Sequence, residues 1–187
     1  VVLFDFGYKR NIRNELVNRG CEVIVVPADT TAEQIREISP DGIMFSNGPG
    51  DPAENTEIIN NIREISKLGI PIFGICLGHQ LMALAHGAKT EKLKYGHRGA
   101  NQPVIDKVLS KTFVTSQNHG YAVVGDSIDP SEGTVSHINA NDGTCEGMRY
   151  SKENAFTVQF HPEAHGGPQD TAYLFDEFID MMKKEMH

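Results

Sequence analysis

The feature that most constrains the fold is a regular alternation of short apolar runs and amphipathic helical patterns along residues 1–87. Strand-length runs separated by helix-length segments are typical of β-α-β units, whose strands pair in parallel and whose helices cover the sheet. The predicted strands are 1–6, 21–27, 42–48 and 70–75, and the predicted helices are 9–20, 31–38, 54–69 and 77–87.

The second half of the chain differs, because turns rather than helices separate its strand-like segments. These segments predict strands at 88–96, 101–108, 111–123, 133–150 and 154–163, with a hairpin at an Asn-Asp-Gly turn and a last helix over 168–186. We therefore expect an α/β fold, with a doubly wound, mostly parallel sheet flanked by helices and additional antiparallel strands in the second half. Residues 1–187 are expected to form a single domain.

Composition argues against several classes of function. The net charge of −8 and the pI of about 5.4 disfavour a large basic surface for nucleic acid or anionic membranes. No apolar run reaches the length that a bilayer requires. Three cysteines without a CxxC pair indicate neither a disulfide framework nor a zinc site, so a reducing cytoplasm is expected. Because Val1 already lies in an apolar run, we also expect further sequence upstream.

A cysteine stands where the fourth predicted strand joins its helix, in the stretch GICLG. This stretch fits the nucleophile-elbow pattern with Cys76 in place of serine, at the carboxyl edge where open α/β sheets bind ligands. Gly74 and Gly78 avoid collisions with neighbouring elements. The helix N-terminus favours a thiolate, and the free N–H of Leu77 can donate to an oxyanion. The alternative is a buried structural cysteine, which explains the flanking glycines poorly.

A thiol nucleophile requires a base, and His161 is the best placed of the eight histidines. It ends a predicted strand, so it reaches the same edge of the sheet as Cys76. Pro162 keeps the chain extended, which puts Glu163 on the same side as His161. The carboxylate can then orient the imidazole and stabilise its protonated form. An ordinary strand exit is the alternative for this stretch alone. His79 is expected to point along its helix instead.

The stretch SNGPGDP, residues 46–52, leaves the third predicted strand at the same edge. Its glycines and prolines indicate a stiff turn with exposed N–H groups. Such a turn could bind phosphate, although it lacks the Lys and Ser/Thr of a P-loop. It could equally supply a second oxyanion donor.

The motifs GICLGHQ, SNGPGDP and VQFHPE, in this order and spacing, resemble those of the class I (triad) glutamine amidotransferases. Members of that family hydrolyse the side-chain amide of glutamine and pass ammonia to a partner, and they have a flavodoxin-like fold. The stretches FDFGYKRNI, YGHRGANQPV, TSQNHGYAV and GGPQDTAYLF are most similar to the small chain of carbamoyl-phosphate synthetase. That family carries an additional N-terminal domain, so this sequence is expected to begin after it.

The resemblance implies that Cys76 is the nucleophile, His161 the general base and Glu163 the carboxylate that orients it. It also implies that the backbone N–H groups of Gly48 and Leu77 are the oxyanion donors. The implied glutamine contacts are Gly48, Gly50, Leu77, Gln80, Asn118, Gly120 and Tyr121. Tyr121 departs from the phenylalanine frequent in the family, and EAHGGP at 163–168 departs from the commoner EASPGP. No metal or organic cofactor is expected in the domain. ATP and bicarbonate would be used by a large synthetase chain, the expected partner.

Three other functions are compatible with parts of the sequence. A γ-glutamyl hydrolase would use the same elbow, but the stretch GHRGANQPV argues against it. A catalytically dead module that regulates a synthetase predicts loss of a triad residue, and none is lost. A flavodoxin-like nucleotide-binding protein would use SNGPGDP as its phosphate loop, which a nucleotide-binding titration would reveal.

Overall fold

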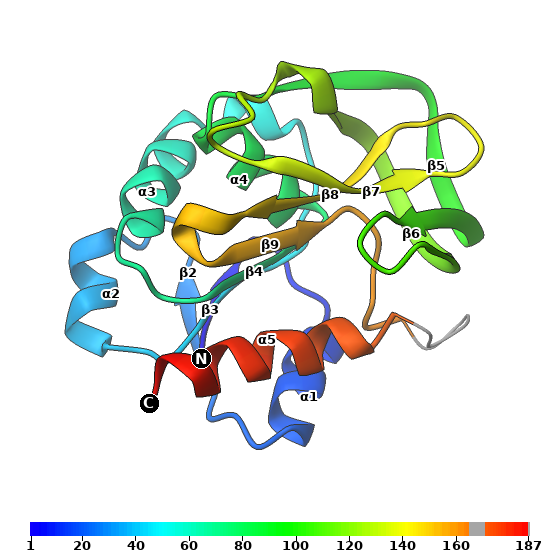
Figure 1. Ribbon diagram of the computed structural model, residues 1–187. Helices are drawn as coiled ribbons and strands as arrows, with labels where there is room; N and C mark the ends of the chain where they lie inside the picture. The colour runs from blue at the N-terminus through cyan, green and yellow to red at the C-terminus, as the bar shows by residue number, and fades with distance from the viewer. Residues whose placement is uncertain (165–170, 187) are drawn as a thin grey trace.

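The computed structural model describes residues 1–164 and 171–186. Within these ranges the strands form one sheet in the order β2-β1-β3-β4-β9-β8-β7-β5-β6 (Figure 1). The strands are β1 (Val2–Asp5), β2 (Ile24–Pro27), β3 (Ile43–Phe45), β4 (Ile72–Ile75), β5 (Lys89–Asp106), β6 (Lys111–Val124), β7 (Thr134–Asn139), β8 (Cys145–Tyr150) and β9 (Ala155–Val158). The helices are α1 (Arg10–Asn18), α2 (Ala32–Ile38), α3 (Thr56–Ser66), α4 (Leu77–Ala85) and α5 (Tyr173–Glu185), with 3-10 turns at Pro52–Glu54, Gly125–Ser127 and Ser151–Glu153.

The sheet has a parallel and an antiparallel part. β2, β1, β3, β4 and β9 pair in parallel. β8, β7, β5 and β6 extend the sheet from β9 by antiparallel pairing. The α/β architecture with antiparallel strands contributed by the second half is therefore confirmed.

Helices cover both faces of the parallel part, which makes the sheet doubly wound. Successive side chains of a strand point to opposite faces. Val2 and Phe4 of β1 accordingly lie in a core formed with α2, α3 and α4, whereas Leu3 lies in a second core formed with α1 and α5. In Figure 1, α1 and α5 lie together on the face opposite α3 and α4. Both faces are apolar, and the strands of this part read as nearly continuous hydrophobic runs for that reason.

One prediction for the second half is wrong. The segments 88–96 and 101–108 are not separate strands, because β5 runs without interruption from Lys89 to Asp106. Its register against β6 shifts between Lys92 and His97 and again between Gly99 and Gln102. Gly96 and Gly99 have φ angles of 69° and 109°. Left-handed glycines permit bulges that bend a strand while it stays paired, and the sequence pattern alone suggested turns.

Other features of the second half follow the prediction. The Asn-Asp-Gly turn does connect an antiparallel pair, β7 and β8. The last helix is present, and it begins at Tyr173. Its predicted start at 168, and the departure from the family pattern at 165–168, lie outside the described residues. None of the helices described is both long and apolar enough to span a membrane.

The topology brings two strand ends together. β4 and β9 are parallel neighbours whose last residues, Ile75 and Val158, are paired across the ladder. Cys76 follows the first of these strands directly, and the chain that leads to His161 follows the second. The predicted nucleophile and base therefore emerge side by side at the carboxyl edge of the sheet, where open α/β sheets bind ligands.

Candidate active site

Cys76 sits at the N-cap of α4 in a backbone conformation that is unusual for a residue with a side chain. Its φ and ψ angles are 54° and −105°. Its N–H donates to the carbonyl of Val158 at 2.9 Å, which fixes the cysteine against β9. Strained residues held in place by surrounding structure concentrate at functional sites, so this conformation supports the nucleophile-elbow interpretation.

Gly74 and Gly78 are required by space on both sides of the cysteine, as predicted. A Cβ atom on Gly78 would lie 2.2 Å from the carbonyl oxygen of Phe45. A Cβ atom on Gly74 would lie 2.9 Å from Cγ2 of Thr157 and 3.2 Å from the backbone of Gly78. The glycines therefore let β3, β4, β9 and α4 converge tightly enough to hold the turn.

His161 and Glu163 lie together, but not through the extended segment that was predicted. β9 ends at Val158, and residues 161–164 form a turn in which the N–H of Ala164 donates to the carbonyl of His161 at 3.3 Å. Nδ1 of His161 is 2.7 Å from Oε1 of Glu163, and the side chains are only 4% and 1% exposed. Burial lowers the pKa of His161, but hydrogen bonding to Cys76 and Glu163 outweighs this effect and raises the pKa to about 9. The imidazole is thus in contact with a thiol on one side and a carboxylate on the other.

The amide of Gln159 adds a contact that the sequence did not suggest. Its Nε2 donates to Sγ of Cys76 at 3.5 Å, and its Oε1 accepts from Nε2 of Gln80 at 2.9 Å. Gln80 also donates to the carbonyl of Tyr121 at 2.8 Å. A chain of hydrogen bonds therefore connects the thiol to β6, the strand that carries several of the implied glutamine contacts.

A cleft of about 470 Å³ opens above the cysteine. Seven residues singled out from the sequence line it: Gly48, Gly50, Cys76, Gln80, Asn118, Gly120 and Tyr121. His161, Glu163 and Leu77 do not line it. The cleft also contains residues that sequence reasoning missed, namely Pro49, Asp51, Lys92, Arg98 and His119. The substrate-contact set implied by the resemblance thus gathers largely in one place.

The two backbone N–H groups implied as oxyanion donors are free to donate to a ligand. Leu77 is the first residue of α4, and neither its N–H nor that of Gly48 finds an acceptor among the described residues. A Cβ atom on Gly48 would lie 2.9 Å from Cδ2 of the Leu77 side chain and 2.1 Å from the carbonyl oxygen of Phe6. Gly48 is therefore glycine because the backbone approaches Phe6 so closely.

His79 points toward β9, not along its helix as predicted. Its Nδ1 is 2.7 Å from Oγ1 of Thr157, and the residue is completely buried. Burial, together with the neighbouring His119 and His137, lowers the pKa of His79 to about 3. This histidine is neutral at physiological pH and fixes α4 to β9.

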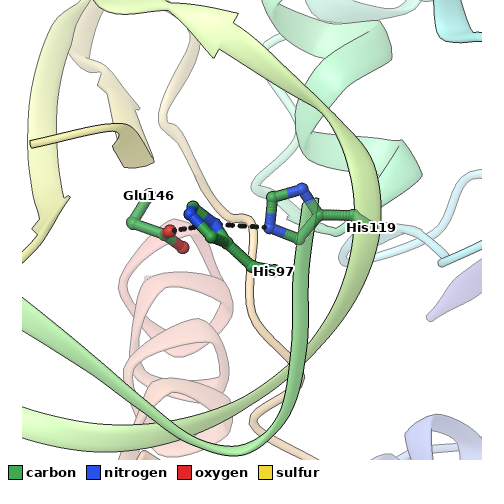
Figure 2. Close-up of side chains that lie close together, drawn as sticks. All are labelled: His97, His119 and Glu146. Carbon is green, nitrogen blue, oxygen red and sulfur yellow. Dashed lines mark hydrogen bonds and ion pairs between the residues drawn. The ribbon is translucent and has the colours of Figure 1, made fainter. Parts of the chain in front are cut away.

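A second histidine cluster, on β5, β6 and β8, offers ligand atoms of the kind that metals bind (Figure 2). Nδ1 of His97 lies 3.2 Å from Nε2 of His119 and 3.3 Å from Oε1 of the fully buried Glu146. The other ring nitrogens also have partners, since Nε2 of His97 is 2.6 Å from Asp142 and Nδ1 of His119 is 2.6 Å from the carbonyl of Tyr121.

Ion pairing accounts for this arrangement. The bonds to Glu146 raise the pKa of His97 to about 9, even though burial opposes them. Burial lowers the pKa of His119 to about 4. A charged His97 between two carboxylates and a neutral His119 together brace the carbonyl of Tyr121. The cluster therefore supports one wall of the cleft through protein contacts.

Comparison with known proteins bears on this geometry. The family model described as glutamine amidotransferase class-I matches residues 2–181. The chain belongs to the class-I glutamine amidotransferase family. The solved structures of two proteins share its fold across its whole length. A putative GMP synthase subunit from Thermoplasma acidophilum has a TM-score of 0.85 at 22% identity over 96% of that chain. A glutamine amidotransferase from Thermotoga maritima has a TM-score of 0.67 at 17% identity over 85% of that chain.

Within the amidotransferase family, the chain is similar to proteins named carbamoyl phosphate synthase small chain. The protein from Staphylococcus epidermidis is 59% identical over 184 residues, which is 98% of this chain and 50% of that protein. The Bacillus cereus protein is 55% identical with the same coverage, and the Fusobacterium nucleatum protein is 55% identical over 100% of this chain and 52% of its own length. The chain spans about half the length of these relatives.

Proposed function

We propose that this amidotransferase hydrolyses L-glutamine to glutamate and ammonia through a Cys76-His161-Glu163 triad. The observation that carries the proposal is the arrangement at the strand ends, where the His161 imidazole interacts with the Cys76 thiol and its Nδ1 lies 2.7 Å from Oε1 of Glu163. A strained cysteine at a helix N-terminus, a histidine and a carboxylate in this order are the parts of an activated thiol nucleophile.

The reaction begins with attack of the thiolate on the amide carbon of glutamine. The N–H groups of Gly48 and Leu77 stabilise the oxyanion that forms. His161 then gives its proton to the departing ammonia, and a glutamyl thioester remains on Cys76. The raised pKa of His161, about 9, keeps the proton available at neutral pH. Water activated by the same histidine releases glutamate, and the proposed chemistry uses no metal or organic cofactor.

The ammonia is proposed to serve carbamoyl-phosphate synthesis, for pyrimidine or arginine production or for both. The support is the 55–59% identity to proteins named carbamoyl phosphate synthase small chain. On this proposal the partner is the large synthetase chain, which uses ATP and bicarbonate, and both work in the cytoplasm. This chain spans about half the length of those relatives, and on this proposal the coupling involves the complete small chain.

The proposed activity is tested by glutamate release from a panel of γ-glutamyl substrates, with Cys76→Ser as the matched variant. Free L-glutamine should be the preferred substrate, and Cys76→Ser should release no glutamate. In the complete small chain with its synthetase, Cys76→Ser should still permit carbamoyl-phosphate formation from supplied ammonia. Preference for polyglutamyl peptides would indicate a γ-glutamyl hydrolase instead.

A further inference from the structure

Two basic residues of β5 face implied glutamine contacts of β6 across the same stretch of the ladder. Arg98 is paired with Asn118, and Lys92 is paired with Tyr121. Residues directly opposite each other in an antiparallel pair project from the same face of the sheet. Both basic residues accordingly line the cleft that contains Cys76. The wall of the cleft that β5 forms is thus positively charged.

Arg98 is the better fixed of the two. Its Nη1 donates to the carbonyl of Tyr95 at 2.8 Å. A Cβ atom on Gly96 would lie 2.5 Å from that nitrogen, so the glycine makes room for the guanidinium. A Cβ atom on Gly120 would lie 3.8 Å from Nη2, which places the other end of the guanidinium beside the backbone of an implied glutamine contact.

The guanidinium therefore has donors to spare where a substrate would lie. Its bond to Tyr95 uses one of five N–H groups, and no other acceptor is found for Arg98 among the described residues. The planar fork of a guanidinium matches a carboxylate with two parallel N–H bonds. Free glutamine carries its α-carboxylate at the end of the molecule opposite the amide that Cys76 attacks.

We propose that Arg98 binds the α-carboxylate of glutamine and so selects free glutamine over substrates whose α-carboxyl group is amidated or in a peptide bond. The inference rests on the proposed glutaminase function and adds a specificity residue to it. Asn118, directly opposite Arg98, borders the same position. Lys92 supplies a second positive charge on the same wall, without a fixing contact among the described residues.

The test uses two reagents that differ only at the α-carboxyl group. 6-Diazo-5-oxo-L-norleucine alkylates a nucleophilic cysteine in glutamine sites, and its α-amide lacks the negative charge. The second-order rate of Cys76 labelling is measured by intact mass and peptide mapping for the wild type, Arg98→Gln and Arg98→Lys. Lys94→Gln is the matched control, because Lys94 lies on the same strand, stacks on Tyr95 and does not line the cleft.

Arg98→Gln should slow labelling by the carboxylate reagent by about 10- to 100-fold, the usual effect of losing a hydrogen-bonded charge pair. It should leave the rate with the amide reagent unchanged, which also shows that the variant is folded. Arg98→Lys should recover part of the loss, and Lys94→Gln should behave as the wild type.

Equal slowing with both reagents, or no slowing with either, would overturn the role of Arg98 while leaving the glutaminase proposal intact. No slowing would mean that the guanidinium serves another surface, such as one that faces a partner. A wild-type protein that is labelled at Cys76 by neither reagent would instead contradict the proposed function itself. The two failures are thus distinguished by the wild-type rate.

Discussion

Nδ1 of His161 lies 2.7 Å from Oε1 of Glu163, and both side chains are almost entirely removed from solvent. The carboxylate accepts a hydrogen bond from Nδ1–H and leaves Nε2 for the thiol, so one short segment after β9 supplies both the proposed orienter and the proposed base. The proposed nucleophile follows the neighbouring strand, β4. This division places the proposed chemistry between the ends of β4 and β9, so a small shift of either strand end would change the distance between the thiol and the imidazole.

Replacement of His161 should lower glutamine hydrolysis more than replacement of Glu163. His161→Asn removes the proton carrier and should reduce kcat by roughly two to four orders of magnitude. Glu163→Gln keeps a hydrogen-bonding partner and should cost less. Steady-state glutamate release measures both. His79→Asn, with folding checked by circular dichroism, is the control. If it lowered kcat as much as His161→Asn while still folded, the assignment of His161 as the base would be wrong.

Cys76 should be the most reactive of the three thiols toward γ-glutamyl electrophiles. Burial raises the pKa of Cys145 to about 12, and burial also raises the pKa of Cys21. Cys76 instead lines the cleft that a γ-glutamyl electrophile would enter, and it lies at a helix N-terminus beside the His161 imidazole. Peptide mapping after a short exposure gives the order of labelling. Equal labelling of all three would reject the elbow assignment.

Stability should depend on pH through His161. Its folded pKa of about 9 exceeds the ordinary value of 6.5, so its contribution is complete below pH 6.5 and is lost as pH rises toward 9. The difference corresponds to on the order of 3 kcal/mol in the free energy of unfolding. Urea unfolding at pH 6 and pH 9.5 should therefore show a larger fall for the wild type than for His161→Gln.

The comparison with His161→Gln is needed because His97 titrates in the same window and in the same direction. Its contribution is present in both proteins and cancels in the difference. An identical fall in the wild type and the variant would show that His161 gains no stabilising partners in the folded state.

Gly78→Ala should be strongly destabilising, because its Cβ would meet the carbonyl oxygen of Phe45 at 2.2 Å, with no flexible side chain to move. The loss in unfolding free energy should exceed about 3 kcal/mol. Gly20→Ala is the control, since its Cβ meets nothing within 4 Å and only the left-handed backbone, with φ of 88°, opposes it. That change should cost about 1 kcal/mol. Similar losses of unfolding free energy for both variants would mean that α4 moves away from Phe45 at little cost.

The sequence was most informative where function depends on local geometry. The glycines around Cys76 and the spacing of His161 and Glu163 predicted contacts that the structure contains, because each is set within a few residues of chain. The alternation of strand and helix patterns predicted the parallel sheet for a different reason, because helical crossovers between strands produce parallel pairing.

Features that depend on the exact register between distant segments could not be predicted. The position of Arg98 in the cleft follows from the bulged register of β5 against β6. From the sequence pattern, this bulge was predicted to be a break between two strands. The pairing of Glu146 with His97 and the contact of Gln159 with Cys76 likewise join strands that are far apart in the chain. Nothing in the local pattern marks these residues as neighbours.

The central claim is that Cys76 forms a glutamyl thioester, and rapid acid quenching of a glutamine turnover followed by mass spectrometry tests it most directly. The account predicts a glutamyl group on the peptide that contains Cys76, its disappearance as glutamine is exhausted, and neither adduct nor glutamate with Cys76→Ser. Glutamate release by Cys76→Ser at the wild-type rate, or an adduct on Cys21 or Cys145 instead, would contradict it.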